Sequence, residues 1–176
     1  MTTELANIDK FKHVLGQLFD NIGVIIGDLN RIGKTDLNAN MVNVLKTYII
    51  SQDKVYVITS FINNSYSYWK DIKNKNEKCM LDNSSIILGE YSNKPEFSSI
   101  KLIFSSHISN EDKDIIWDCI HSLIKLSLKY VYEEKGTSVT TKVDNGKKTL
   151  TISYKNKEKH SIVNIPESYK LWNLTF

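Results

Sequence analysis

The chain has 176 residues, of which 41% are hydrophobic and 24% charged, which excludes wholesale disorder and predicts one sizeable hydrophobic core. The net charge is +3, and Arg31 is the only arginine. Because arginine is the preferred ligand of guanine edges and phosphates, this composition argues against sequence-specific reading of nucleic acid.

The first predicted element is a helix over residues 4 to 22. Apolar residues recur there and beyond at steps of three and four, as on the buried face of a helix. They are Ile8, Phe11, Leu15, Leu18, Ile22, Ile25, Leu29 and Ile32. Gly16, Gly23 and Gly27 argue against a longer helix, since each costs about 1 kcal/mol relative to alanine. We favour an end near Gly23; alternatively, Gly23 and Gly27 let another helix approach closely.

A second helix is predicted after Asn38 or Asn40, either of which can cap its first turn. One face of this helix is expected to be apolar. Its members are Met41, Val44, Leu45, Tyr48 and Ile49.

The next stretch, from Lys54 to Ile72, is interpreted as helical. Val55 and Val57 also alternate as in a strand, but the apolar residues as a whole suit helical spacing. They are Val55, Ile58, Phe61, Ile62, Tyr68, Trp69 and Ile72.

Short elements are predicted between residues 74 and 105. The residues Asn74 to Asn76 form a polar break, and a short helix is expected over 77–81. Another helix is expected over 97–105, with Asn93 and Pro95 marking the loop before it.

The clearest prediction is a long helix at about 109–135. The Ser109 hydroxyl can cap it while Asp112 reaches back in a capping box. Lys135 suits the negative end of the helix dipole, and Gly136 ends the helix. Apolar residues cover most of its circumference, so we expect other segments to cover it on several sides as the central helix of the core.

A β-hairpin is predicted at about 137–155, where apolar and polar residues alternate. Asn145-Gly146 supplies the two-residue turn, because both residues tolerate positive φ. This turn places Val139 opposite Ile152 and Thr141 opposite Leu150 on one face. A third strand is expected over 161–165.

The predicted fold class is therefore α+β and mostly helical, in a single domain over 1–176. Its helical part spans 1–136, and the hairpin and C-terminal tail span 137–176.

Cysteine usage and the N-terminus indicate a reducing compartment. Cys79 and Cys119 can form one disulfide, but two reduced core thiols are favoured. The N-terminal residues Met1 to Glu4 do not resemble a signal peptide, so the protein is not expected to be secreted. No window approaches about 18 uninterrupted apolar residues, so no membrane span is expected.

No catalytic residue, cofactor site or metal site is predicted. The segment Gly27 to Thr35 resembles a phosphate-binding loop, but it has five residues between its first glycine and Gly33-Lys34 where that loop has four. Cys119 and His121 are two apart in a helix and point in different directions, so they do not readily share a metal ion. Scattered Ser, His and Asp residues show no signature of an activated nucleophile.

Two lysine clusters are interpreted as solvated surface. Because aromatic residues precede the first cluster, the alternative is a weak, salt-sensitive site for a polyanion such as nucleic acid. The residues of this alternative site are Lys70, Lys73, Lys75, Lys78, Lys147 and Lys148.

The C-terminal tail carries large apolar residues. Chain ends usually fray unless they dock, so this tail is expected to pack on its own core or to insert into a partner. Its partner-binding candidates are Tyr169, Leu171, Trp172, Leu174 and Phe176.

Two segments resemble small proteins of nucleocytoplasmic large DNA viruses. The first is Phe61 to Ser65 followed by Trp69, Ile72 and Glu77, and the second runs from Asp112-Lys113 through Trp117 to Ser122–Lys125. The resemblance implies a viral protein of the virion or the host cytoplasm and identifies no catalytic residue. Small proteins of this kind often cement capsids or bind host factors.

The expected function is that of a non-enzymatic structural or interaction protein, a minor capsid-associated virion component. It would bind other virion proteins or itself through apolar helix faces and the C-terminal tail. The alternative is a nucleic-acid-binding accessory protein that uses the lysine and aromatic clusters.

Overall fold

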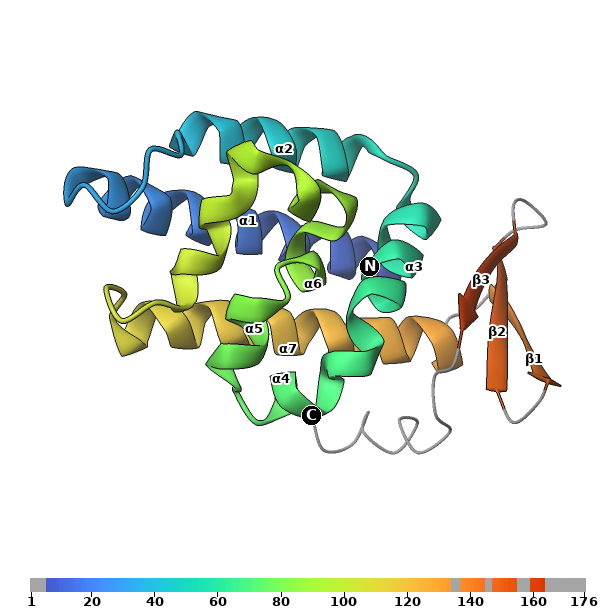
Figure 1. Cartoon of the computed structure of the whole chain (residues 1–176). Coiled ribbons are helices and arrows are strands. Elements are labelled where there is room, and N and C mark those ends of the chain that lie inside the picture. The colour runs from blue at the N-terminus through green and yellow to red at the C-terminus, as the bar shows by residue number, and fades with distance from the viewer. Residues whose placement is uncertain (1–5, 134–136, 145–146, 155–158, 164–176) are drawn as a thin grey trace, which may run out of the picture.

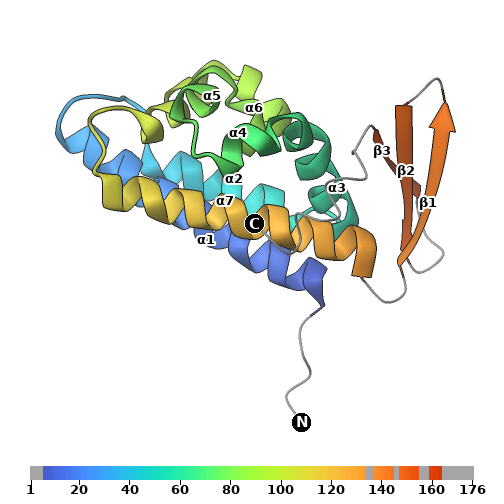
Figure 2. The ribbon, with the colours of Figure 1, turned by 90° about the horizontal axis from the view of Figure 1, so that it is seen from below.

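The computed structural model describes residues 6–133, 137–144, 147–154 and 159–163. Its helical part is built on two long antiparallel helices, which lie side by side in both views (Figure 1 and Figure 2). These are α1 (Asn7–Arg31) and α7 (Asn110–Glu133), and the other helices lie across one side of the pair. The mostly helical character predicted from the sequence is confirmed.

Helix α1 continues through both glycines, so the predicted end near Gly23 is wrong. A Cβ atom added at Gly23 or Gly27 would meet nothing within 4 Å, so neither glycine serves a close helix approach. Beyond Gly23 the helix still buries Ile25, Ile26 and Leu29. Burying such side chains contributes about 1.5–3 kcal/mol each, which outweighs the roughly 1 kcal/mol that each glycine costs.

Helix α2 (Ala39–Ser51) begins at its predicted cap. The Asn38 side chain accepts a hydrogen bond from the backbone N–H of Asn40 at 2.8 Å. Of the predicted apolar face, Leu45 is buried, whereas Met41, Val44 and Tyr48 are exposed. Helix α2 also buries Val42.

Helix α3 (Lys54–Ser65) confirms the helical interpretation of this stretch. The Asp53 carboxylate caps it by accepting from the backbone N–H groups of Val55 and Tyr56, at 2.9 and 3.0 Å. Val55 is also buried on the inner face of the helix, as are Ile58 and Ile62.

Short helical segments connect α3 to α7. They are η1 (Tyr66–Tyr68), α4 (Trp69–Lys73), α5 (Glu77–Asp82), α6 (Ser85–Leu88), η2 (Gly89–Asn93) and η3 (Pro95–Phe104). The break at Asn74–Asn76 is confirmed, and the segment predicted as a helix over 97–105 is the 3₁₀-helix η3. Both α6 and η2 lie in a stretch for which no helix was predicted.

Helix α7 has the predicted N-terminal cap with one difference. The Ser109 hydroxyl accepts from the Asp112 backbone N–H at 3.1 Å and donates to the Asp112 carboxylate at 2.7 Å. The carboxylate thus contacts the hydroxyl and not the backbone of Ser109. As predicted, neighbouring segments cover α7, which contacts α1, α3 and α4. The predicted end at Lys135 and Gly136 lies outside the described residues.

Three strands follow α7, in the order β1-β2-β3 and antiparallel. They are β1 (Thr137–Asp144), β2 (Lys147–Tyr154) and β3 (Lys159–Val163). Val139 lies opposite Ile152, and Thr141 lies opposite Leu150. The turn Asn145-Gly146 lies outside the described residues, so the hairpin stays a prediction.

The buried side chains of the helices form one core, which encloses a side-chain hydrogen bond. The Trp69 indole N–H donates to the Ser65 hydroxyl at 2.9 Å, and both residues are buried. Cys79 and Cys119 are free thiols. Among the described residues, no helix is both long enough and apolar enough to cross a membrane.

Candidate ligand-binding pocket

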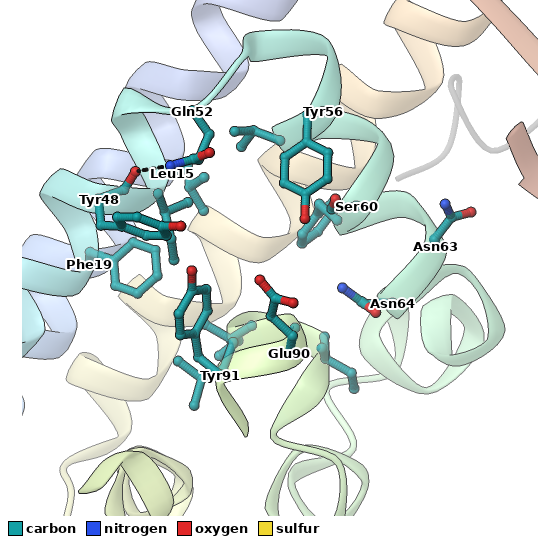
Figure 3. Close-up of a pocket in the computed structure, with 17 residues that line it drawn as sticks. Leu15, Phe19, Tyr48, Gln52, Tyr56, Ser60, Asn63, Asn64, Glu90 and Tyr91 are labelled. Atoms are coloured by element: carbon teal, nitrogen blue, oxygen red, sulfur yellow. Dashed lines mark hydrogen bonds between the residues drawn. The ribbon is translucent and has the colours of Figure 1, made fainter. Parts of the chain in front are cut away.

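A pocket of about 400 Å³ opens between α2, α3 and the α6–η2 segment (Figure 3). Its floor is apolar and comes from buried side chains of two helices. Leu15 and Phe19 reach it from α1, and Phe61 reaches it from α3. Pockets of this size, with an apolar floor and a few polar groups, are typical of small-ligand sites, which span roughly 300–1,000 Å³.

Three tyrosines from three elements surround the opening. Tyr48 comes from α2, Tyr56 from α3 and Tyr91 from η2, and in Figure 3 their hydroxyls point into the same space. The rings of Tyr48 and Tyr91 meet edge to face, with centroids 5.8 Å apart and an interplanar angle of 77°. Tyr48 is 51% exposed and Tyr56 is 45% exposed, so much of their surface is open to a ligand.

Glu90 supplies the only charge among the described residues that line the pocket. Its carboxylate is directed toward the space between the tyrosines (Figure 3). Burial raises the pKa of Tyr91 above its ordinary value, and the hydrogen bond and charge interaction with Tyr48 raise it further, followed by Glu90 and Tyr56. Tyr91 therefore stays a neutral phenol at physiological pH.

One cation already lies against this tyrosine group. The Lys94 ammonium nitrogen is 5.4 Å from the centroid of the Tyr91 ring. Lys94 is exposed and is not among the residues that line the pocket. An ammonium at this distance from an aromatic face is attracted by the ring quadrupole.

Local backbone features hold the pocket walls in place. Gly89 has φ +55°, and a Cβ atom there would lie 2.8 Å from the Asn64 side-chain nitrogen. The positive φ favours glycine at this position, and this turn presents Glu90 and Tyr91 to the pocket. On the opposite wall the Gln52 amide donates to the Tyr48 carbonyl at 3.3 Å, at the end of α2.

The predicted lysine residues do not lie at this pocket. Lys70 and Lys73 belong to α4, Lys78 to α5, and Lys75 to the connection between these helices. The Lys75 ammonium pairs with the Asp114 carboxylate of α7 at 2.6 Å. Nearby, Lys113 pairs with Glu77 at 3.0 Å. Carboxylates of α5 and α7 therefore interleave with this basic cluster.

The remaining predicted residues are placed only in part. Lys147 and Lys148 open strand β2 and lie opposite Asp144 and Val143. The tail residues lie outside the described part of the chain, so their partner-binding role stays a prediction. They are Tyr169, Leu171, Trp172, Leu174 and Phe176.

The two rejected motifs have structural roles in this fold. Gly27 to Arg31 form the last turns of α1, and the chain leaves that helix through Gly33 with φ +68°. A ring nitrogen of His121 lies 2.8 Å from the Ile72 carbonyl, and the Asn21 amide approaches the Cys119 sulfur at 3.8 Å. Within the described ranges, no three His, Cys, Asp or Glu residues gather as a metal site would require.

The pocket itself was not predicted from the sequence. Tyr48 was assigned to the apolar face of a helix, and no role was given to Glu90 or Tyr91. The usable signal is Gly89-Glu90-Tyr91, a glycine before an acid and an aromatic, but such a tripeptide does not show which distant residues complete a site.

Comparisons with known proteins give no match: no protein-family model, curated protein or solved structure is significantly similar to this chain.

Proposed function

We propose that this chain is a non-enzymatic interaction protein that binds a protein partner on the outer face of α2. The observation that carries the proposal is the row Met41, Val44 and Tyr48, which we call the α2 stripe. These residues are spaced as one face of a helix and are 37%, 69% and 51% exposed. A stripe of this kind is typical of a helix that packs against another protein.

The pocket adjoins the α2 stripe and supports the proposal. Tyr48 belongs to both, because its side chain lies on the stripe and also lines the pocket (Figure 3). A partner seated on α2 therefore has a recess beside it that can take a projecting side chain. Exposed aromatic anchors next to a pocket are the features that often carry most of the binding energy in an interface.

The wider setting of the proposal comes from the viral resemblance. We propose that the chain is a minor capsid-associated component of a virion, or acts in the host cytoplasm, and that its partner is another virion protein or a second copy. The C-terminal hairpin and the apolar tail over 137–176 would supply a second contact in this assembly.

The experiment compares partner capture by two matched variants in extracts of infected cells. The double variant Met41→Ser and Val44→Ser removes apolar surface from the α2 stripe, whereas Val24→Ser removes a side chain that is 64% exposed on α1. We expect the first to lose the partner and the second to keep it. Equal capture by both variants would contradict the proposal.

Light scattering after size exclusion tests the same surface for self-association. If the partner is a second copy, wild type elutes as an oligomer and the double variant as a monomer. A wild-type monomer that captures no protein would refute the proposed function.

Polyanion binding by the lysines has less support. Exposed ion pairs such as Lys75–Asp114 reduce the positive potential that would attract phosphates. A steep loss of single-stranded DNA binding with rising salt would favour this alternative.

A further inference from the structure

We propose that the tyrosine pocket binds the methylated ammonium group of a lysine side chain from a partner protein. The inference deepens the proposed function and rests on it for the claim that the ligand belongs to a protein. It is carried by the juxtaposition of Tyr48, Tyr56 and Tyr91 with the Glu90 carboxylate above an apolar floor.

The three aromatic rings supply the attraction for a cation. Tyr48 and Tyr91 stand edge to face with ring centroids 5.8 Å apart, and both residues line the pocket. Tyr56 lies on α3 at the other side of the opening, with its hydroxyl directed into the same space (Figure 3). Rings arranged in this way around one space form an aromatic cage, the known device for recognising methylated ammonium groups.

The Glu90 carboxylate supplies the complementary charge. It is the only charged group among the described residues that line the pocket, so the charge of the recess is negative. The Lys94 ammonium lies 5.4 Å from the Tyr91 ring centroid, within the distance at which an aromatic ring attracts an ammonium ion. Lys94 is also a competitor, and its positive charge weakens the attraction for a second cation.

The apolar floor favours a methylated ammonium group over a bare one. Leu15, Phe19 and Phe61 offer carbon surface at the base of the pocket. An unmodified ammonium is strongly hydrated and would lose that water against such a floor. Methyl groups reduce this loss and pack on carbon, while the positive charge stays in reach of the rings.

The position of the pocket favours a protein-borne ligand over a free small molecule. Tyr48 is shared with the α2 stripe, where the proposed partner sits. A lysine on that partner has a long, flexible side chain that can reach from the stripe into the recess. The interface and the ammonium group would then be recognised together.

The test measures peptide binding to the full chain by calorimetry. The probes are one short peptide with a central trimethyllysine, the same peptide with unmodified lysine, and a neutral analogue in which carbon replaces the trimethylated nitrogen. We expect the trimethyllysine peptide to bind about tenfold more tightly than either control. Equal binding of the neutral analogue would overturn the cation assignment, and tighter binding of unmodified lysine would overturn the methyl preference.

Free choline separates a protein-borne ligand from a small molecule. If choline binds as tightly as the trimethyllysine peptide, the pocket is a small-molecule site and the claim of a partner lysine is wrong. Weaker binding of choline supports the claim.

Single variants assign the effect to the pocket. Glu90→Gln and Tyr48→Leu each weaken binding of the trimethyllysine peptide by about tenfold, because they remove the charge or one ring face. Glu111→Gln, which removes an exposed carboxylate at the start of α7, leaves the affinity unchanged. Lys94→Gln strengthens binding by removing the competing charge. Unchanged affinity in Glu90→Gln and Tyr48→Leu would contradict the inference.

Failure here can be told apart from failure of the proposed function. If no peptide binds while Met41→Ser with Val44→Ser still abolishes partner capture, the pocket assignment is wrong and the proposed function stands. If the trimethyllysine peptide binds but those two substitutions leave capture intact, the assignment of the partner to the α2 stripe is wrong.

Discussion

The paired helices α1 and α7 and the exposed helix α2 use similar apolar spacing for opposite purposes. Helix α1 buries apolar residues from Ile8 to Leu29, and α7 buries them from Ile116 to Val131. Helix α2 buries Val42 and Leu45 and leaves Met41, Val44 and Tyr48 exposed to solvent. An apolar stripe at helical spacing thus predicts a helix that packs, but it does not say whether the packing partner is inside the same chain.

The largest expected effect tests the buried side of this comparison. Trp117→Ala removes a side chain that is 2% exposed and lies 4.7 Å from the Phe104 ring, centroid to centroid. We expect the free energy of unfolding to fall by about 3–5 kcal/mol, because both burial and packing are lost. Urea unfolding followed by circular dichroism measures the change.

Val44→Ala is the matched variant on the exposed side. Val44 is 69% exposed, so we expect a change within about 0.5 kcal/mol. A large loss of stability in Val44→Ala would mean that this face of α2 packs within its own chain. The contrast between α2 and the paired helices α1 and α7 would then be wrong.

Two glycine variants are expected to change the free energy of unfolding in opposite directions. Gly89→Ala forces a side chain into φ +55° and against Asn64, so we expect a loss of about 1–3 kcal/mol and a distorted pocket. Gly23→Ala in α1 meets open space, and the helix is expected to gain about 1 kcal/mol. Thermal unfolding of both variants checks the signs, and a loss in Gly23→Ala would show that this glycine has a packing role.

A smaller effect is expected at the N-terminal cap of α3, the helix that carries one wall of the pocket. Asp53→Ala removes the acceptor for the first backbone N–H groups of α3, at the turn that carries Tyr56. The free energy of unfolding should fall by about 1 kcal/mol. Asp36→Ala, in the exposed connection before α2, is the control and should be neutral. Chemical denaturation of the two variants would show no difference if the cap contributed nothing.

The smallest effect on stability at neutral pH is expected for Tyr91→Phe. The pKa of Tyr91 is raised in the folded state, chiefly by burial. Below a pH of about 10 the phenol is protonated in both states, so stability is unaffected. Above it the unfolded chain loses the proton first, and the free energy of unfolding falls as the pH rises toward the folded pKa. Tyr91→Phe should reduce this alkaline loss. Parallel unfolding curves for wild type and variant above pH 10 would contradict the assignment.

The starts of α2 and α7 were predictable because their determinants are local, whereas α1 begins at Asn7, without a side-chain cap, and not at the predicted residue 4. Asn38 and Ser109 cap their helices through residues two or three positions away, so short stretches of sequence carry the whole signal. The extent of α1 was not predictable in this way. Its continuation past Gly23 depends on the burial of Ile25 and Ile26 by segments distant in sequence.

The pocket was beyond prediction for the same reason. Phe19, Tyr48, Tyr56 and Glu90 come from four separate elements, and no spacing in the sequence links them. The short segments α6 and η2, which carry one wall, lack the periodicity that reveals longer helices.

The sequence by itself determined that this chain is mostly helical and where α2 and α7 begin, because periodicity and capping act within a few residues. Tertiary structure decided which apolar faces are buried and which side chains meet around the pocket. Burial depends on how distant segments cover one another, and that coverage leaves the α2 stripe exposed beside three tyrosines and a carboxylate.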